Sequence, residues 1–337
     1  MSNDCIPWVE KHRPHKINQI IQQDIIRDEF NKIKESGDMP HLLLHGPPGT
    51  GKTSSILALV MELFGPYRFD ERVLELNASD ERGIGIVRNK IIHFAKITIG
   101  TPDPNYPSPN FKVIILDEAD AMTNDAQSAL RKVMESTTKL TRFVFICNYD
   151  HQIIDSIKSR CSTFKFKYID NKNCIKKLKS VAKAEKIKLN KDVLKTISDI
   201  SQGDVRRAIN ILQNLQYIDI ENIDVDCVYD ITSYVDSKNL DDIWNVALTG
   251  DIKTIYKHVQ NIINNGYPIY YVLHAINTKI RKCKVLTDIE KAKMNIFLSQ
   301  CERRIIGRSN EFIQLMSIFC YLNGLKKYGI DAKTKIF

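Results

Sequence analysis

The stretch GPPGTGKT, residues 46–53, constrains this chain more than any other, because it predicts a local fold and a ligand together. It directly follows the short apolar run HLLLH and directly precedes the helical pattern SSILALVMELF. Glycines at such a turn let backbone N–H groups curl around phosphates, and the following helix adds its positive N-terminal end. An ordinary glycine-rich turn needs neither the lysine nor the helix. The sequence therefore predicts a phosphate-binding loop made of Gly46, Pro47, Pro48, Gly49, Thr50, Gly51, Lys52, Thr53 and Ser54.

Polar side chains in and after this loop are predicted to act on a nucleotide's phosphates and Mg²⁺. Lys52 is expected to neutralise phosphate charge, and the Thr53 hydroxyl to ligate Mg²⁺. The apolar run IILDEAD ends in two carboxylates, so we expect Asp117 to hold the metal and Glu118 to take a proton from attacking water. A solvated acidic turn is the alternative for this pair. Asn148 ends the next run, FVFICN, and suits a residue that orients water or senses the γ-phosphate, although asparagine is also a common turn former.

The order of the apolar runs predicts the fold class. Short runs at residues 41–45, 72–77, 111–116 and 142–147 alternate with helical patterns, which is typical of an α/β parallel sheet with helices on both faces. A proline-rich segment, residues 99–110, is expected to be a surface loop. From about residue 168 onward only helical patterns follow, with a second boundary near residues 233–238. We therefore predict three domains, residues 1–167, 168–235 and 236–337.

Composition restricts the class of protein. A chain of 337 residues can bury a core without disulfide or metal support. Its eight cysteines are scattered without a C-x-x-C pair, which favours a reduced intracellular protein, and its apolar runs are too short to span a bilayer, so no membrane association is expected. Lys and Arg exceed Asp and Glu by 49 to 40, a net charge of +9. This excess is compatible with a polyanionic partner and also with an ordinary basic surface.

Four further stretches carry a resemblance to a known family. They are PWVEKHRP (residues 7–14), ELNASDERGI (75–84), SRC (159–161) and GDVRRAIN (203–210). Together with the loop and the DEAD stretch, they resemble the small subunits of replication factor C, the sliding-clamp loader of the AAA+ ATPase family. The resemblance covers residues 7–210, and the remaining helices fit the family by layout only. It implies an AAA+ sheet domain, a small helical lid domain and an all-α collar domain for oligomerisation.

The resemblance also implies roles for individual residues. Arg160 would be an arginine finger that reaches the ATP of the adjacent protomer, and Arg206 would be a sensor that touches the γ-phosphate from the lid. The stretch PWVEKHRP would lie beside the adenine, which adds Val9 and Arg13 to the ATP-binding residues. His12 stands where the family has tyrosine, and Gln22 stands where it has glycine in the following turn.

The activity and partners implied are those of a clamp loader. Such an ATPase subunit works in a heteropentamer of replication factor C subunits and loads a sliding clamp, of the proliferating cell nuclear antigen type, onto primer-template DNA. Candidate DNA contacts are Arg82, Arg88 and Lys90, for which an ordinary basic surface is the alternative. The lysine-rich helix of residues 172–188 is expected to be solvated.

Two other functions remain open at this point. One is another AAA+ machine, such as a Holliday-junction motor or a remodeller. The other is a ring subunit that uses ATP only as structural glue, against which Glu118 argues. Localisation is expected to be nuclear if the source is eukaryotic, and otherwise cytoplasmic or in a viral factory.

Overall fold

A parallel sheet forms the centre of the N-terminal part of this computed structural model, which describes residues 6–78, 84–97, 99, 102–217, 223–235 and 237–328. Five strands lie in the order β2-β3-β4-β1-β5. All four neighbouring pairs are parallel. The strands are β1 (His41–His45), β2 (Val73–Asn77), β3 (Lys112–Asp117), β4 (Thr141–Cys147) and β5 (Cys161–Lys165). Because the strands are parallel, the segments that follow β1, β3 and β4 leave the sheet at the same edge.

The register brings three of the predicted functional segments together at this edge. His45, the last residue of β1, pairs with Cys147, the last residue of β4. Leu116 of β3 pairs with Phe145 of β4. The phosphate-binding loop, the DEAD stretch and Asn148 therefore begin side by side, as expected of ligand sites at the carboxyl ends of parallel strands.

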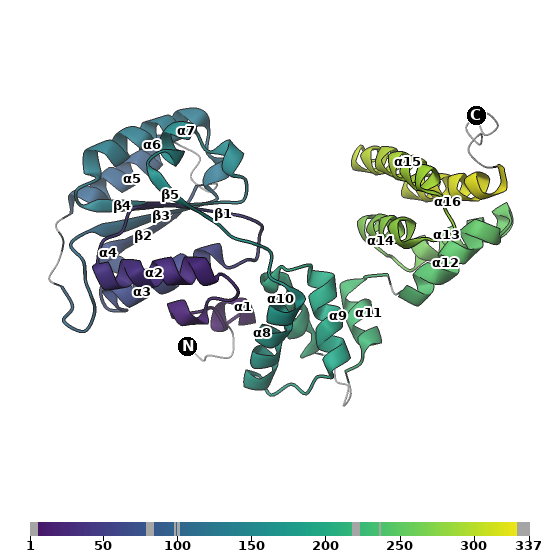
Figure 1. Ribbon diagram of the computed structural model, residues 1–337, viewed down its shortest axis with the longest axis horizontal. Helices are drawn as coiled ribbons and strands as arrows, with labels where there is room; N and C mark the ends of the chain where they lie inside the picture. Colours follow the sequence, from purple (N-terminus) through teal and green to yellow (C-terminus); the bar gives the residue numbers. More distant parts are fainter. Residues whose placement is uncertain are drawn as a thin grey trace. The chain divides into compact units, whose positions relative to one another are not determined.

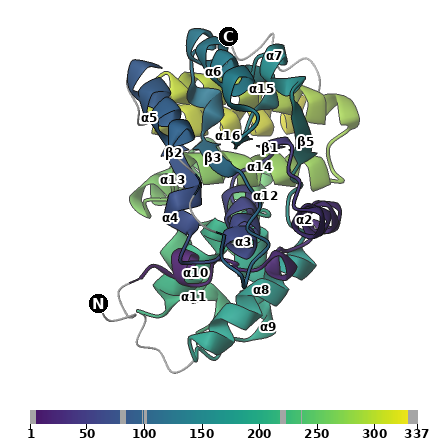
Figure 2. The same cartoon turned by 90° about the vertical axis from the view of Figure 1, so that its left-hand side faces the viewer.

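Helices cover both faces of the sheet (Figure 1). Alternate strand residues point to opposite faces, so Leu42 and Leu44 pack in one apolar cluster and Leu43 packs in the other. The first cluster includes residues of α2 (Asp24–Ser36) and α3 (Lys52–Phe64), and the second includes residues of α5 (Ile84–Lys96), α6 (Asn124–Thr137) and α7 (Asp155–Lys158). Figure 2 shows the same two helical layers on either side of the strands. Short helices complete this part: α1 (Trp8–Lys11), η2 (Ile17–Gln19), α4 (Phe69–Arg72), η3 (Ala119–Ala121) and η4 (Asp150–Gln152).

Three helices follow the sheet: α8 (Asn171–Ala184), α9 (Lys191–Ser201) and α10 (Val205–Leu215). Each begins with a capping side chain, because Asp170, Asn190 and Asp204 accept hydrogen bonds from backbone N–H groups of the first turn. Apolar residues on their facing sides are buried, among them Leu178, Ile197 and Leu212. We call α8, α9 and α10 the lid helices.

The C-terminal part of the chain is entirely helical in the residues described, with an apolar core of its own. The stacked rings of Phe297 and Tyr321, with centroids 4.3 Å apart, belong to that core. Asn323 donates hydrogen bonds to the carbonyl oxygens of Ala247 (3.1 Å) and Gly250 (3.0 Å), which ties the last helix to the end of α12. The helices are α11 (Val225–Thr232), α12 (Ser237–Thr249), α13 (Ile252–Asn264), α14 (Ile269–Lys282), α15 (Asp288–Ile306) and α16 (Glu311–Tyr328).

The predicted fold class is confirmed, with differences in detail. The four predicted strands are present within one residue of their predicted bounds. The fifth, β5, was not predicted, because CSTFK is a short, largely exposed edge strand without an apolar run. The chain divides into two compact units, Met1–Asn222 and Ile223–Phe337, and the three-domain division stays a prediction. Among the helices that the structure describes, none has the length and apolar character needed to cross a lipid bilayer.

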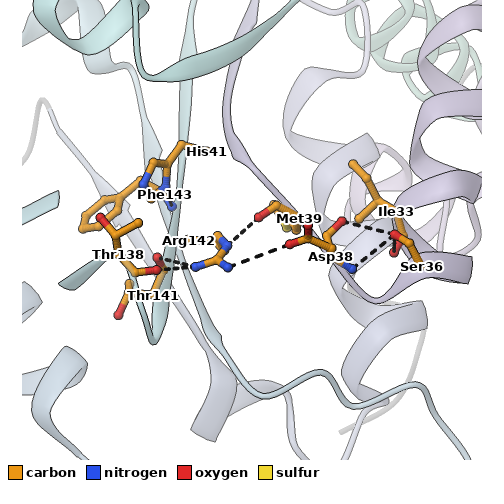
Figure 3. A network of polar contacts seen from close by, with 9 residues as sticks. All are labelled: Ile33, Ser36, Asp38, Met39, His41, Thr138, Thr141, Arg142 and Phe143. Atoms are coloured by element: carbon orange, nitrogen blue, oxygen red, sulfur yellow. Dashed lines mark hydrogen bonds and ion pairs between the residues drawn. The ribbon is translucent and has the colours of Figure 1, made fainter. Parts of the chain in front are cut away.

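An arginine binds the opposite edge of the sheet, where β1 and β4 begin (Figure 3). The Arg142 guanidinium donates hydrogen bonds to the carbonyl oxygens of Met39 and Thr138. Its second terminal nitrogen lies 3.9 Å from a carboxylate oxygen of Asp38. One side chain thus joins the segment before β1 to the turn before β4 and satisfies carbonyl groups that the sheet leaves unpaired.

His41 lies beside this arginine at the first position of β1 (Figure 3). Its Nδ1 accepts a hydrogen bond from the backbone N–H of Phe143 (3.1 Å), so the neutral imidazole fits the site. Burial, with a smaller effect of the Arg142 charge, lowers the pKa of His41 from 6.5 to about 4. Protonation would remove the acceptor and place a second cation next to the guanidinium.

This arrangement predicts an acid-sensitive fold. Because the pKa of His41 is depressed in the folded chain, the unfolded chain binds more protons between about pH 6.5 and 4. The part of the free energy of unfolding that depends on neutral His41 is present above this window. It should therefore be lost as the pH falls through the window. We expect His41→Gln to reduce the dependence of the free energy of unfolding on pH, as measured by urea unfolding at a series of pH values. Trp8 fluorescence in a Trp244→Phe background would report the N-terminal unit. His151→Gln, which changes an exposed histidine, should leave the wild-type dependence intact, and an equal effect of both variants would contradict the assignment.

Candidate nucleotide-binding site

The loop between β1 and α3 has the backbone conformation that its glycines permit. Gly46, Gly49 and Gly51 have φ angles of 143°, 67° and 92°, which residues with a Cβ atom rarely adopt. A Cβ atom on Gly46 would lie 2.4 Å from the carbonyl oxygen of Phe166, so the loop also passes too close to the chain for a larger residue. Within the described residues, no side chain caps the N-terminus of α3, which leaves its first N–H groups for an anion.

Lys52 occupies the centre of the loop. Its side chain is buried, and its Nζ donates hydrogen bonds to the carbonyl oxygens of Gly46 (2.7 Å) and Pro47 (2.9 Å). A third bond goes to Oδ1 of Asn148 (2.9 Å), at the end of β4. Burial lowers the pKa of Lys52, and the negative charge of Asp117 opposes this shift. A desolvated ammonium held by three neutral acceptors is suited to meet a phosphate.

Thr53 and Asp117 are in direct contact. The Thr53 hydroxyl donates a hydrogen bond to Oδ2 of Asp117 (2.8 Å). A hydroxyl beside a carboxylate is the oxygen ligand set that Mg²⁺ prefers, with the remaining positions filled by phosphate oxygens and water. In the part of the chain that the structure describes, no group of three or more His, Cys, Asp or Glu residues could hold a metal ion by itself. The two residues therefore fit a nucleotide-bound Mg²⁺ rather than a metal held by protein alone.

Glu118 lines the same cavity and has an unusual backbone. Its φ angle is 53°, and its N–H donates a hydrogen bond to Oδ1 of the preceding residue, Asp117 (2.8 Å). The left-handed conformation turns the chain sharply at the strand end and leaves the Glu118 side chain exposed. An exposed carboxylate next to the phosphate-binding loop can accept a proton from water, which is the role predicted for it.

Asp120 is a residue of the site that the sequence reasoning missed. Its Oδ2 accepts hydrogen bonds from the backbone N–H groups of Asn148 (3.0 Å) and Tyr149 (3.1 Å). The last carboxylate of the DEAD stretch therefore fixes the chain from which the Asn148 side chain projects. The sequence could have indicated this role, because two adjacent parallel strands end at this edge. Exposed backbone N–H groups there need hydrogen-bond acceptors.

A cavity of about 230 Å³ extends from the loop between the N-terminal segment and the lid helices. Val9 and Arg13, which the family resemblance assigned to the adenine side, both line it. Arg13 also forms an ion pair with Glu10 (3.0 Å). Apolar walls come from Ile20, Ile21, Ile169 and Ile209, which the sequence analysis did not single out. Because the triphosphate has to lie on the loop, these walls offer the apolar contact that a base requires.

The first lid residues of α10 touch the loop. The N–H of Val205 donates a hydrogen bond to the carbonyl oxygen of Gly49 (3.2 Å). The side chain of Asp204 is the N-cap of α10, since it accepts a hydrogen bond from the N–H of Arg207 (3.0 Å). Arg206 is exposed and lines the cavity, and its charge contributes to lowering the pKa of Lys52 after burial. A cation in the first turn of a helix opposes the helix dipole, so it is suited to an anionic ligand.

Substitution of Gly49 tests the close contact between the phosphate-binding loop and the lid helix α10. A Cβ atom at Gly49 would lie 1.8 Å from Oδ1 of Asp204, and the φ angle of 67° adds backbone strain. We expect Gly49→Ala to weaken ATP binding about tenfold or more, because strain of about 1–2 kcal/mol within the phosphate-binding loop adds to the clash with Asp204. Gly37→Ala is the matched control, because Gly37 has φ 65° and a Cβ atom added there would have no described atom within 4 Å. Equal ATP affinities of the two variants, by titration calorimetry, would refute the argument.

Arg160 lies outside this cavity. It is exposed at the end of α7, where its guanidinium donates hydrogen bonds to Oε1 of Glu135 (2.8 Å) and to the carbonyl oxygen of Ser156 (2.8 Å). The structure thus brings Lys52, Thr53, Asp117 and Asn148 together and keeps Arg160 apart from them. The assigned role of each residue stays a prediction.

The candidate DNA contacts are only partly described. Arg82 and the side chain of Arg88 lie outside the described residues. Lys90 is exposed on α5. The expectation that the lysine-rich α8 is wholly solvated is wrong for Lys177, which lines the cavity and donates a hydrogen bond to the carbonyl oxygen of His12 (2.9 Å). Desolvation lowers the pKa of this lysine. Its place was missed because Leu178, Val181 and the other buried residues of α8 define a narrow apolar stripe that Lys177 borders.

Comparison with protein families gives three matches along the chain. A model of the AAA family, the ATPases associated with various cellular activities, matches residues 42–168. A model of the RCF1/5-like AAA+ ATPase lid domain matches residues 176–215. A model of the replication factor C C-terminal domain matches residues 235–321. The first match contains the loop, the DEAD stretch, Asn148 and Arg160.

Similar proteins extend the likeness over nearly the whole chain. Replication factor C subunit 2 of Saccharomyces cerevisiae is 41% identical over 328 residues, which cover 95% of this chain and 93% of that relative. Subunit 4 of Homo sapiens is 38% identical over 315 residues, covering 93% and 86%. A putative replication factor C small subunit of Acanthamoeba polyphaga mimivirus is 34% identical over 361 residues, covering 97% and 99%.

Solved structures share the fold at low identity. The Holliday junction branch migration motor RuvB of Thermotoga maritima superposes with a TM-score of 0.52 and 15% identity, and the match covers 70% of this chain and 79% of that one. At this identity the likeness concerns the fold alone.

Proposed function

Because this chain belongs to the replication factor C family of AAA ATPases, as a small subunit, we propose that it is an ATP-hydrolysing subunit of a clamp loader. In this function, ATP binding lets the assembled subunits hold an open sliding clamp on primer-template DNA. Hydrolysis then releases the closed clamp on the DNA.

One observation carries the proposal: the groups predicted to bind the chain's own nucleotide lie around one cavity, and the predicted arginine finger lies outside it. Lys52, Asn148 and the Thr53–Asp117 pair lie at one sheet edge, with Glu118 and Arg206 on the same cavity. Arg160 is exposed elsewhere. Arginines supplied by a neighbouring chain stabilise the charge that develops on a transferred phosphoryl group. Nucleotide bound between two chains would then favour their assembly, since each chain supplies part of the site.

The chain's residues divide the work of hydrolysis. Lys52 and the N–H groups of the loop hold the phosphates, and Thr53 with Asp117 would hold Mg²⁺. The metal, when bound, neutralises charge on the phosphate oxygens. Glu118 accepts a proton from the attacking water, and Asn148 fixes the position of that water or of the γ-phosphate. Arg206 contacts the γ-phosphate from the lid helix α10, so the position of the lid helices depends on whether that phosphate is present.

Assembly with other replication factor C subunits follows from the family. We propose further that these form a heteropentamer, that the clamp is of the proliferating cell nuclear antigen type, and that Arg82, Arg88 and Lys90 contact DNA phosphates. Such contacts position a protein on DNA and carry no sequence information. The corresponding location is the nucleus in a eukaryote, and otherwise the cytoplasm or a viral factory.

The alternative functions are less favoured. A Holliday-junction motor shares the fold at 15% identity, whereas replication factor C subunits match at 33–41%. A ring subunit that uses ATP only as glue would not require a carboxylate at the position of Glu118.

A reconstitution experiment tests the proposed function. The chain would be purified with its co-expressed replication factor C partners and its clamp, and ATP turnover measured with and without primed DNA. We expect the clamp and primed DNA together to raise turnover about tenfold or more, because nucleotide closure and DNA binding are coupled. Single-stranded DNA without a primer is the control. Turnover that ignores both clamp and primer, or an isolated chain that hydrolyses ATP as fast as the complex, would overturn the proposal.

A further inference from the structure

The N-terminal segment of the chain, residues 7–23, which we call the strap, is held to the lid helices by a buried carboxylate. Glu185 follows the last residue of α8, and its side chain is only 10% exposed. Its oxygens accept hydrogen bonds from Nζ of Lys11 and Nε2 of His12, at 2.8 and 2.5 Å. A carboxylate that is largely removed from water requires such partners, and Lys11 and His12 both lie in the strap.

Further hydrogen bonds join the strap to the lid side. Lys177 donates to the carbonyl oxygen of His12 (2.9 Å). The N–H of Trp8 donates to Oε1 of Gln213 on α10 (3.0 Å). Oε1 of Gln22 accepts from the N–H of Asp170 (2.6 Å), at the start of α8. The strap is therefore tied to both ends of α8 and to α10.

Part of this connection lines the cavity, but its carboxylate does not. Val9, His12 and Arg13 of the strap line the cavity together with Lys177, Val205 and Ile209 of the lid helices, whereas Glu185 does not line it. The loop that holds the phosphates has its own supports, since the acceptors of Lys52 lie in the loop and at the residue directly after β4. Lys52, at the phosphate end of the site, is thus held by contacts that do not involve Glu185 or the strap.

We propose that Glu185 is a positioning residue that fixes the strap against the lid, so that binding of the nucleotide base, but not of the triphosphate, depends on its carboxylate. The inference rests on the proposed nucleotide site. It adds to that function the inference that the base and the phosphates are bound by different parts of the site. It also means that a change of lid position carries the base-binding strap with it.

Binding measurements on the purified full chain can separate the two ends of the site. Titration calorimetry would compare ATP with inorganic tripolyphosphate, which has the phosphates and no base. We expect Glu185→Ala to weaken ATP binding about tenfold, the effect of one lost hydrogen bond to a charged group, with no change for tripolyphosphate. Glu185→Gln keeps an acceptor and should recover part of the ATP affinity. Glu29→Gln, in an exposed ion pair of α2, should change neither affinity.

A second variant protects the test against general destabilisation. His12→Phe removes a partner of Glu185. The ATP affinity of the double variant His12→Phe/Glu185→Ala should therefore be no lower than that of the single variant with the lower affinity. Additive losses, an equal loss for ATP and tripolyphosphate, or unchanged ATP affinity would each overturn the inference. A wild-type chain that binds both ligands equally would overturn it as well. Failure of the proposed clamp-loader function would instead appear as turnover indifferent to clamp and primed DNA, a separate measurement.

Discussion

Glu118→Gln is expected to abolish nearly all ATP turnover at this chain's site while leaving ATP bound. Glutamine has almost the same size and cannot accept the proton of the attacking water, so hydrolysis should fall by about 10²–10⁴-fold. The groups proposed to hold the phosphates and Mg²⁺, Lys52 and the Thr53–Asp117 pair, are untouched by the change. Single-turnover measurements would show the effect in an assembled complex whose other subunits are blocked in nucleotide binding.

The control for this variant is Glu71→Gln. Glu71 is also an exposed glutamate, paired with Arg68 at 2.9 Å on α4. Its replacement should leave both turnover and affinity unchanged. Wild-type turnover in Glu118→Gln would remove the catalytic assignment and favour ATP as a structural ligand. Loss of ATP affinity in Glu118→Gln would instead place this carboxylate in nucleotide binding.

Arg160→Ala is expected to slow hydrolysis at the neighbouring subunit's site by about 10³-fold, the lower range for loss of an arginine finger. The chain's own ATP affinity should stay the same, because Arg160 does not line its cavity. Stability should change little, since the ion pair with Glu135 is exposed and such pairs contribute about 0–1 kcal/mol. Titration calorimetry on the isolated chain and turnover of the assembled complex measure the two effects separately.

Arg27→Ala is the matched control for the finger. Arg27 is likewise an arginine in a partly exposed ion pair, with Asp24 at 2.8 Å on α2. It should affect neither the neighbour's turnover nor the chain's own affinity. If Arg160→Ala weakened nucleotide binding at the chain's own loop, the arginine would act within its own chain and the assignment would be wrong.

Local patterns were sufficient to predict the centre of the site. A phosphate-binding loop needs closely spaced glycines, a lysine and a following helix, all within a few residues, so the loop could be predicted without knowledge of the rest of the fold. The residues after β3 and β4 could be predicted because apolar runs end where the chain leaves a parallel sheet. The family resemblance rested on motifs of the same local kind. It also pointed to subunit 4 of animals, and human subunit 4 is 38% identical, while yeast subunit 2 is 41% identical.

Contacts between distant segments could not be predicted in the same way. Lys177 and His12 are 165 positions apart, and nothing near either residue indicates the other. The edge strand β5 lacks an apolar run because one side of it is open to water. Gln22 shows a further limit. Its φ of 58° fits the glycine that the family resemblance implies at this turn, but the hydrogen bond from Asp170 that glutamine adds is visible only in the folded chain.

The three hydrogen bonds of Lys52 have a consequence for the energetics of the cycle. Its ammonium already has acceptors within the chain, the carbonyl oxygens of Gly46 and Pro47 and the amide oxygen of Asn148. Arrival of a phosphate is therefore an exchange of one satisfied state for another, and only the difference between them contributes to affinity. After the phosphate departs, the same oxygens can receive the lysine again, so product release leaves no stranded charge behind it. Such a site can turn over repeatedly, because neither the state with phosphate bound nor the state after its release is strongly favoured by Lys52.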